Sequence, residues 1–222
     1  MRRLLSYVRR AVDDYHMIPE GARVAVGISG GKDSLLLLTA LKGLSRFHPS
    51  GFSLVGITVD MGFPGMDFAP VRAFCEAEEI PYDIVETRIG DVVFDVREET
   101  NPCSLCAKMR RGALHDRAKA LGCSHVALGH HRDDAVETFL MSLIFEGRMH
   151  CYRPVTWLSR REVTVIRPLL YLPESEAEAL ARALRLPVVA STCPMDGKSR
   201  REEVKQLLET LSERFPDIEG NI

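Results

Sequence analysis

The chain has 222 residues, which is enough for one α/β domain with a sizeable apolar core. Its 45% apolar and 27% charged residues are typical of a soluble globular protein, and its formal net charge of −2 excludes nucleic-acid binding through overall charge. No stretch approaches the run of about 18 apolar residues that spans a membrane. The N-terminal sequence MRRLLSYVRRAVDDYH also lacks the apolar segment and cleavage site of a signal peptide. We therefore expect a cytoplasmic protein that does not enter the membrane.

Strand-like and helix-like segments alternate along almost the whole chain, without an internal repeat. We expect helices over residues 1–16, 33–46, 68–79, 103–122, 133–147, 174–186 and 198–215, and strands over 23–29, 52–60, 82–87, 125–129 and 162–169. This order predicts an α/β fold with a mainly parallel sheet flanked by helices. It also predicts one domain over residues 1–222, with its core over 22–195. Residues 147–161, which contain Trp157, are expected to form an irregular loop near the substrate.

A glycine-rich loop follows the first predicted strand, in the sequence VAVGISGGKDSLLLLTAL. A turn of this kind between a strand and a helix points backbone N–H groups at one spot, where the helix dipole adds positive charge. A Walker-type loop is excluded because Asp33, and not serine or threonine, follows Lys32, and because the glycine spacing differs. The segment SGGKDS resembles instead the signature loop of the PP-loop ATPases, which adenylate a carbonyl oxygen and release pyrophosphate. A purely structural glycine turn is the alternative.

Polar residues follow other predicted strands at the same edge of the sheet, where ligands of parallel sheets bind. Asp60 ends the second strand, and the sequence GHHRDD, Gly129–Asp134, follows the fourth. Asp133 and Asp134 stand where aspartate caps a helix, so a structural role explains at least one of them. Together with His130 they also favour Mg²⁺ binding or proton transfer, although a histidine here can simply be a polar loop residue.

Two cysteines, Cys103 and Cys106, lie near the start of the helix predicted over 103–122. Their spacing puts both sulfur atoms on one helix face, and Cys-x-x-Cys suits zinc, an iron–sulfur cluster or a redox disulfide. The helix N-terminus and the basic residues that follow should lower the pKa of both thiols. Those basic residues are Lys108, Arg110 and Arg111.

Cys193 is the third candidate, because a strand over residues 186–189 would bring it to the same sheet edge. A closed structural zinc site needs four ligands. Three thiolates without an obvious fourth fit a cluster with one open iron. We interpret the remaining cysteines, Cys75, Cys123 and Cys151, as structural thiols.

The ordered motifs resemble those of the tRNA 2-thiocytidine synthetases along nearly the whole chain. They are SGGKDS, CSLCAKMRRG, LGHHRDDAVETFL, VIRPLLY and the late Cys193. The resemblance implies an adenine-nucleotide alpha-hydrolase-like fold that uses ATP and Mg²⁺ to adenylate the C2 oxygen of a cytidine in the anticodon loop of tRNA. Sulfur from sulfide or a cysteine desulfurase then replaces that oxygen at a 4Fe-4S cluster held by three cysteines. Whether the protein acts as a homodimer is left open.

The resemblance also assigns roles residue by residue. The nucleotide-binding residues are Ser29, Gly30, Gly31, Lys32, Asp33, Ser34, Asp60, Gly129 and His130. The catalytic residues are Lys32, Arg110, Asp133 and Asp134. The cluster ligands are Cys103, Cys106 and Cys193. Four basic clusters, at residues 2–10, 108–111, 160–161 and 198–201, are predicted to hold tRNA phosphates. Their alternative is a set of solvated helix faces.

Two other functions are weighed against sulfur transfer. The first is an amidating ligase that adenylates its substrate in the same way, which the three cysteines disfavour because amination needs no thiolate. The second is a non-catalytic nucleotide or redox sensor that uses the cysteines as an oxidation switch.

Overall fold

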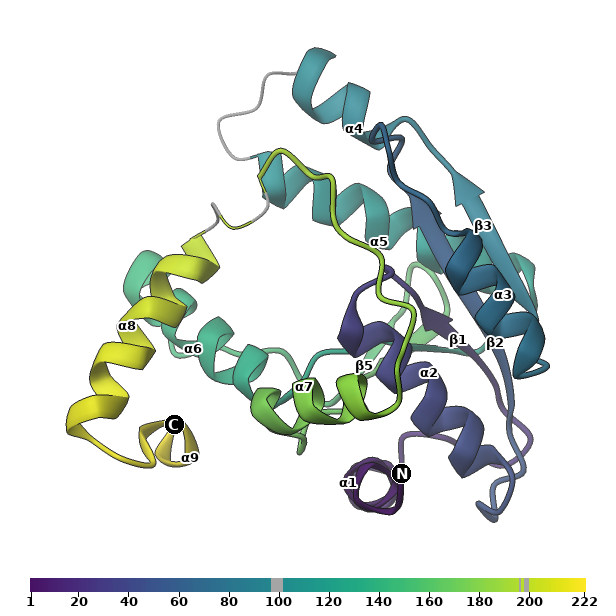
Figure 1. Ribbon diagram of the computed structural model, residues 1–222, viewed down its shortest axis with the longest axis horizontal. Coiled ribbons are helices and arrows are strands. Elements are labelled where there is room, and N and C mark those ends of the chain that lie inside the picture. The colour runs from purple at the N-terminus through teal and green to yellow at the C-terminus, as the bar shows by residue number, and fades with distance from the viewer. Residues whose placement is uncertain (97–101, 196, 198–199) are drawn as a thin grey trace.

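A computed structural model describes residues 1–96, 102–195, 197 and 200–222 of the chain (Figure 1). Its centre is a six-stranded sheet with the order β3-β2-β1-β4-β6-β5. The strands are β1 (Arg23–Gly27), β2 (Ser53–Asp60), β3 (Tyr82–Glu86), β4 (His125–Ala127), β5 (Val155–Leu158) and β6 (Val163–Ile166). All neighbouring strands pair in parallel except β5, which runs antiparallel to β6 at the edge. The prediction of a mainly parallel α/β sheet is confirmed.

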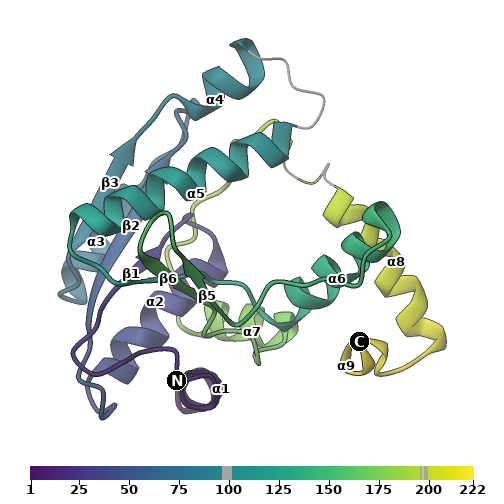
Figure 2. The ribbon, with the colours of Figure 1, turned by 180° about the vertical axis from the view of Figure 1, so that it is seen from behind.

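Helices cover both faces of the sheet (Figures 1 and 2). One face packs against α1 (Arg2–Asp14), α2 (Lys32–Ser45), α3 (Ala69–Ala77) and α7 (Glu174–Ala183), and the other against α5 (Pro102–Ala120). The short α4 (Ile89–Asp91) and the π-helical turn η1 (Val92–Val96) precede α5. Beyond the sheet, α6 (Arg132–Glu146) packs against α8 (Arg200–Arg214), and α9 (Ile218–Asn221) follows.

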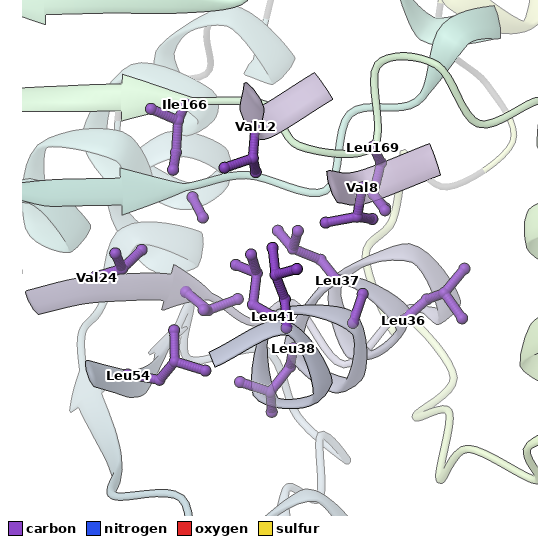
Figure 3. Packing of buried hydrophobic residues seen from close by; sticks show 14 of the residues in the cluster. Val8, Val12, Val24, Leu36, Leu37, Leu38, Leu41, Leu54, Ile166 and Leu169 are labelled. Atoms are coloured by element: carbon purple, nitrogen blue, oxygen red, sulfur yellow. The ribbon is translucent and has the colours of Figure 1, made fainter. Parts of the chain in front are cut away.

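The apolar core is built around α2, whose residues Leu35 to Leu38 are all fully buried. This helix lies between the sheet and the helices α1 and α7, so apolar side chains are covered around its whole circumference (Figure 3). Along β1 the side chains alternate between two cores: Val24 and Val26 pack toward α2, whereas Ala25 packs toward α5. The strand and helix of this first unit therefore hold the loop between them rigidly in place.

Two predictions about local structure are wrong, and two short elements were not predicted. Residues 147–161 are not irregular throughout, because β5 pairs with β6 there in a hairpin. Residues 186–189 form no strand, and α4 and η1 were not predicted. The predicted helix over 198–215 is observed as α8, and its first two predicted residues lie outside the described part of the chain.

None of the helices in the described ranges is both long and apolar enough to cross a membrane.

Candidate functional site

The loop Ser29–Ser34, called the glycine loop below, is folded by its own two serines. The hydroxyl of Ser34 donates to the carbonyl of Gly31 at 2.9 Å, and the N–H of Ser29 donates to the Ser34 hydroxyl at 3.2 Å. Gly31 is the N-cap residue of α2, and no side chain in the described part of the protein caps this helix end. The first N–H groups of α2 are therefore available to an anion.

Two other segments touch the glycine loop so closely that glycine is required. Gly30 has a φ of +86°, and its carbonyl accepts a hydrogen bond from the N–H of Val189 at 2.9 Å. A Cβ atom on Gly30 would lie 3.1 Å from the Cβ of Val189, and one on Gly129 would lie 3.0 Å from the carbonyl of Asp33. The glycine loop is thus packed against the segment after α7 and the loop after β4. This agrees with the prediction that the loops after neighbouring parallel strands lie at the same edge of the sheet.

Lys32 is held beside the glycine loop by two carboxylates. Its Nζ donates to Asp33 Oδ2 at 3.1 Å and to Glu174 Oε1 at 3.2 Å, and Glu174 Oε2 accepts from Lys205 at 2.7 Å. Burial acts to lower the pKa of Lys32, but Asp33 and Glu174 outweigh it and raise the pKa. Burial likewise acts to raise the pKa of Glu174, but Lys205 and Lys32 outweigh it and lower the pKa. Lys32 is therefore a cation at neutral pH and Glu174 an anion.

Glu174 and Lys205 were not predicted from the sequence as site residues. The available signal was the position of Glu174 in the first turn of a predicted helix. A cavity of about 360 Å³ lies next to Lys32, between α7 and the segment that follows it. Arg182, Arg185 and Glu178 also line this cavity, so three cationic side chains and one carboxylate meet there. The cavity suits a small anion that leaves or approaches the glycine loop.

Both aspartates after β4 are engaged in structural hydrogen bonds. Asp133 Oδ2 accepts from the N–H of Glu174 at 2.8 Å, and Asp134 Oδ2 accepts from the N–H of His131 at 2.9 Å. His131 Nδ1 in turn accepts from the N–H of Asp134 at 3.3 Å, which completes a capping box at the start of α6. Arg201 from α8 donates to the other oxygen of Asp134 at 3.1 Å. Only Asp134 takes part in capping α6, whose N-cap residue is His131, whereas Asp133 binds the first N–H group of α7.

His130 is a half-buried, neutral histidine whose Nδ1 atom is buried. Burial lowers its pKa to about 4, against the opposing charge of Asp134. Its ring packs on that of Tyr152 with centroids 5.0 Å apart, and its Nδ1 has no hydrogen-bond partner among the described residues. The predicted residue therefore lies next to the glycine loop, but its partner Tyr152 was not predicted.

Two of the three predicted cysteines lie at the start of α5, and the third lies on the segment that follows α7. Cys103 and Cys106 lie on its first turns, half-buried, and the chain that carries Cys193 from α7 toward α8 passes beside this helix end (Figure 1). Burial raises the pKa of Cys106, the charge of Arg110 opposes this, and the charges of Cys193 and Cys103 add to the increase. The prediction that basic neighbours lower the thiol pKa is therefore wrong for Cys106, because burial exceeds the effect of Arg110.

Across the described ranges, no three His, Cys, Asp or Glu side chains stand close enough together to bind one metal ion. An iron–sulfur cluster distributes its thiolate ligands over different irons, so its ligands are further apart than those of a single zinc ion. The three thiols are half-buried and form no such group in the described chain, so their assignment as cluster ligands stays a prediction that rests on thiolate chemistry.

Asp60 and Arg110 occupy the edges of this region. Asp60 ends β2, the strand next to β1, and its Oδ1 accepts from the N–H of Gly62 at 2.9 Å. Arg110 is exposed on α5, one turn beyond Cys106. Both predicted residues thus lie near the glycine loop or the thiols, but Asp60 also stabilises its own turn.

The basic clusters differ in how their charges are used. In α1, Arg9 pairs with Asp13 and Arg10 with Asp14, while Arg161 pairs with Asp116. Lys108, Arg110 and Arg111 are exposed on α5, at the same end of the helix as the thiols. The cluster on α5 is therefore the strongest candidate for contact with an acidic substrate.

Comparison with known proteins gives one consistent result. The family model described as PP-loop domain matches residues 4–210. A tRNA-cytidine(32) 2-sulfurtransferase of Geobacter sulfurreducens is 37% identical over 100% of this chain and 87% of the relative, and one of Pelobacter propionicus is 38% identical over 100% and 83%. Among solved structures, the U34-tRNA thiolase NcsA from Methanococcus maripaludis with its [4Fe-4S] cluster is 29% identical, with a TM-score of 0.78 over 98% of this chain and 74% of that chain.

Proposed function

The chain belongs to the PP-loop family, and we propose that it is an ATP-dependent tRNA sulfurtransferase that exchanges the C2 oxygen of cytidine 32 for sulfur. Relatives with that name match the full length of the chain at 37% and 38% identity. The thiolase with a TM-score of 0.78 carries a 4Fe-4S cluster and acts on tRNA as well.

One observation carries the proposal: the nucleotide loop and the third thiol belong to one connected unit. Val189 is hydrogen-bonded to Gly30 of the glycine loop, and Cys193 follows four residues later, where its charge acts on Cys106. An enzyme that activates an oxygen with ATP and then replaces it with sulfur needs both sites within reach of one atom. An amidating ligase or a nucleotide sensor has no such need.

In the first step, the chain's own residues bind ATP and stabilise the leaving group. The amides of the glycine loop and the free end of α2 bind the phosphates. The C2 oxygen of the cytidine forms a bond to the α-phosphorus, and the bond from that phosphorus to the bridging oxygen breaks, so pyrophosphate leaves with the electron pair. Lys32 offsets the charge that grows on pyrophosphate, and Arg182 and Arg185 line its path away from the loop.

Mg²⁺ bound together with ATP supplies further neutralisation of the phosphate charge. Asp33 fits a role as its protein ligand, because Asp33 Oδ1 is buried without a partner in the described chain while Oδ2 accepts from Lys32. Asp60, Asp133 and Asp134 each accept a backbone hydrogen bond. The proton-transfer role of Asp133 or Asp134 stays a prediction.

In the second step, sulfur replaces the activated oxygen. Cys103, Cys106 and Cys193 would hold a 4Fe-4S cluster, which supplies an iron without a protein ligand for the incoming sulfur. We propose sulfide as the donor; sulfur that a cysteine desulfurase delivers as a persulfide would first need a two-electron reduction to sulfide by a thiol reductant. The sulfur forms a bond to C2, the bond from C2 to the oxygen breaks, and AMP leaves with that oxygen and the electron pair. Arg110, next to Cys106, attracts the phosphate of the adenylated base.

The test uses the protein prepared without oxygen and loaded with iron and sulfide, together with ATP, Mg²⁺, sulfide and unmodified tRNA. We expect 2-thiocytidine at position 32 by nucleoside mass spectrometry, with one AMP and one pyrophosphate for each sulfur. Cys103→Ala should lose both iron and product, whereas Cys123→Ala, which removes a buried thiol outside the three, should keep both.

Other results would contradict the proposal in distinct ways. Thiouridine at position 34 would place the protein with the structural relative and not with the sequence relatives. AMP formation without any thionucleoside, but with an added amine, would favour the amidating ligase. Full iron content in the Cys103→Ala variant would refute the assignment of the cluster ligands.

A further inference from the structure

A second cavity of about 360 Å³ lies between α5 and the β5–β6 hairpin. Figure 2 shows the hairpin beside α5, at the open edge of the sheet. Arg111 and His115 from α5 form one wall, and Thr156 and Leu158 from β5 form the opposite one. The volume lies at the low end of small-ligand pockets, roughly 300–1,000 Å³, so it suits one nucleotide and no larger structure.

The lining combines apolar walls with cationic and hydrogen-bonding groups. Leu128, Leu158 and Val165 supply apolar surface, whereas Arg111, Arg153 and Arg167 supply positive charge, and no acidic residue of the described chain lines the cavity. Apolar walls suit the faces of a base, and arginines suit a phosphate. The set as a whole therefore selects an anionic ligand with a flat apolar part.

Three buried polar atoms that belong to the lining residues lack a hydrogen-bond partner among the described residues. They are Tyr152 Oη, Arg167 Nε and His115 Nε2. Burial of such groups without partners is costly, so they are expected to meet a ligand or water. The ring of Tyr152 packs against the guanidinium of Arg167 at 4.5 Å and the ring of His130 at 5.0 Å, and these contacts fix the position of its hydroxyl.

The cavity adjoins the reaction site but is not part of it. Its lining includes no residue of the glycine loop, none of the three predicted cluster cysteines and neither Asp133 nor Asp134. Tyr152 and His130 connect the two places, because His130 follows Gly129, which touches Asp33. A base in this cavity would lie next to a reacting base without being the one that reacts.

We propose that this cavity binds one unpaired nucleotide of the tRNA anticodon loop adjacent to the nucleotide that is thiolated. The inference rests on the proposed function and names the part of the substrate that positions the reacting base. Sequence-specific RNA recognition commonly uses unpaired nucleotides that are turned out of the loop into such pockets. The exposed arginine Arg111 at the cavity belongs to the same α5 cluster that extends toward the thiols.

The experiment measures binding of anticodon stem–loops in which each loop nucleotide in turn is replaced by an abasic unit. Thr156→Phe fills the cavity, and Thr164→Phe adds the same bulk on β6, where alternation places it on the opposite face of the hairpin. For the wild type we expect one position, adjacent to the reacting one, to raise Kd about tenfold when it lacks its base. Thr156→Phe should bind the intact stem–loop about tenfold more weakly, and its Kd should not rise further when the sensitive position is abasic. Thr164→Phe should behave as wild type.

The affinity for ATP without RNA should be the same in all three proteins. Equal losses at the abasic position in wild type and Thr156→Phe would overturn the inference, as would a sensitive position that is the reacting one. If Thr156→Phe does not fold, Tyr152→Phe replaces it as the test, because it removes only the unpartnered hydroxyl. In Tyr152→Phe the increase in Kd caused by the abasic unit must be smaller than in the wild type. If the wild type thiolates tRNA and no abasic position matters, only this inference fails. If no thionucleoside forms at all, the proposed function fails.

Discussion

Replacing His130 by phenylalanine is expected to weaken the dependence of stability on pH. Burial lowers the pKa of His130 to about 4 from an ordinary value of 6.5. Between these values the unfolded chain binds a proton that the folded protein does not bind, so the free energy of unfolding falls as the pH falls from about 7 toward 4. Below about pH 4 both states are protonated, and this contribution levels off.

The size of the effect follows from the two pKa values of His130. Since one pKa unit corresponds to 1.36 kcal/mol, the full contribution is about 3 kcal/mol, and about 2 kcal/mol of it falls between pH 7 and pH 5. Phenylalanine keeps the ring that packs on Tyr152 and removes a nitrogen that has no partner in the described chain. The variant should therefore fold at pH 7 and lose less stability on acidification.

Urea unfolding at pH 7, 6 and 5 measures the effect directly. His115 and His125, whose pKa values burial also lowers, stay in both proteins, so their contributions cancel in the comparison. His150→Gln removes an exposed histidine and should keep the wild-type slope, because burial is the cause of the effect. Wild type and His130→Phe with parallel stability curves would refute the reasoning, and with it the neutral state of this ring.

Three further changes test two parts of the site and one ion pair outside it. Glu174→Gln weakens the pairing with Lys32 and Lys205 and should lower Tm by about 5 °C in a thermal melt, whereas Glu178→Gln should not. Gly30→Ala combines a φ of +86° with a close approach to Val189, so urea unfolding and ATP titration should show losses in both stability and ATP affinity. Gly21→Ala, with a φ of +67° in open space, should lose about 1 kcal/mol of stability and no ATP affinity. Asp83→Asn breaks the paired bonds to Arg117 that lower the pKa of Asp83, so it should cost about 1 kcal/mol at pH 7, and the deficit should shrink as the pH falls below about 4.

The order of strands and helices could be predicted because each buried strand is a short apolar run between turns. The strand β5 could not, because its hairpin has none of the usual glycine or asparagine turn signals: the turn residue with positive φ, 54°, is Glu162. Its side chains become half-buried only because β5 pairs with β6. Edge strands of this kind depend on a partner that the local sequence does not reveal.

The glycine loop could be predicted for the opposite reason, since every element of its geometry is local. Ser29, Gly31 and Ser34 close the loop among themselves within six residues. The partner of Lys32 could not be predicted, because Glu174 is 142 residues away and its position depends on where α7 packs. The effect of burial on the Cys106 thiol was missed for a related reason, since its surroundings come from tertiary packing and not from its own helix.

The segment between α7 and α8 connects the glycine loop to Cys193, the third predicted cluster ligand. It needs no strand to reach the sheet edge, because the N–H of Val189 donates to the carbonyl of Gly30 and the two backbones touch there. Because Cys193 follows Val189 by four residues, we expect a ligand that shifts the glycine loop to shift Cys193 as well. The same segment lines the cavity beside Lys32 through Leu186 and Val188. The glycine loop and the segment that carries Cys193 are thus joined by one hydrogen bond and one steric contact, and a bulkier residue at position 30 is expected to disturb both together.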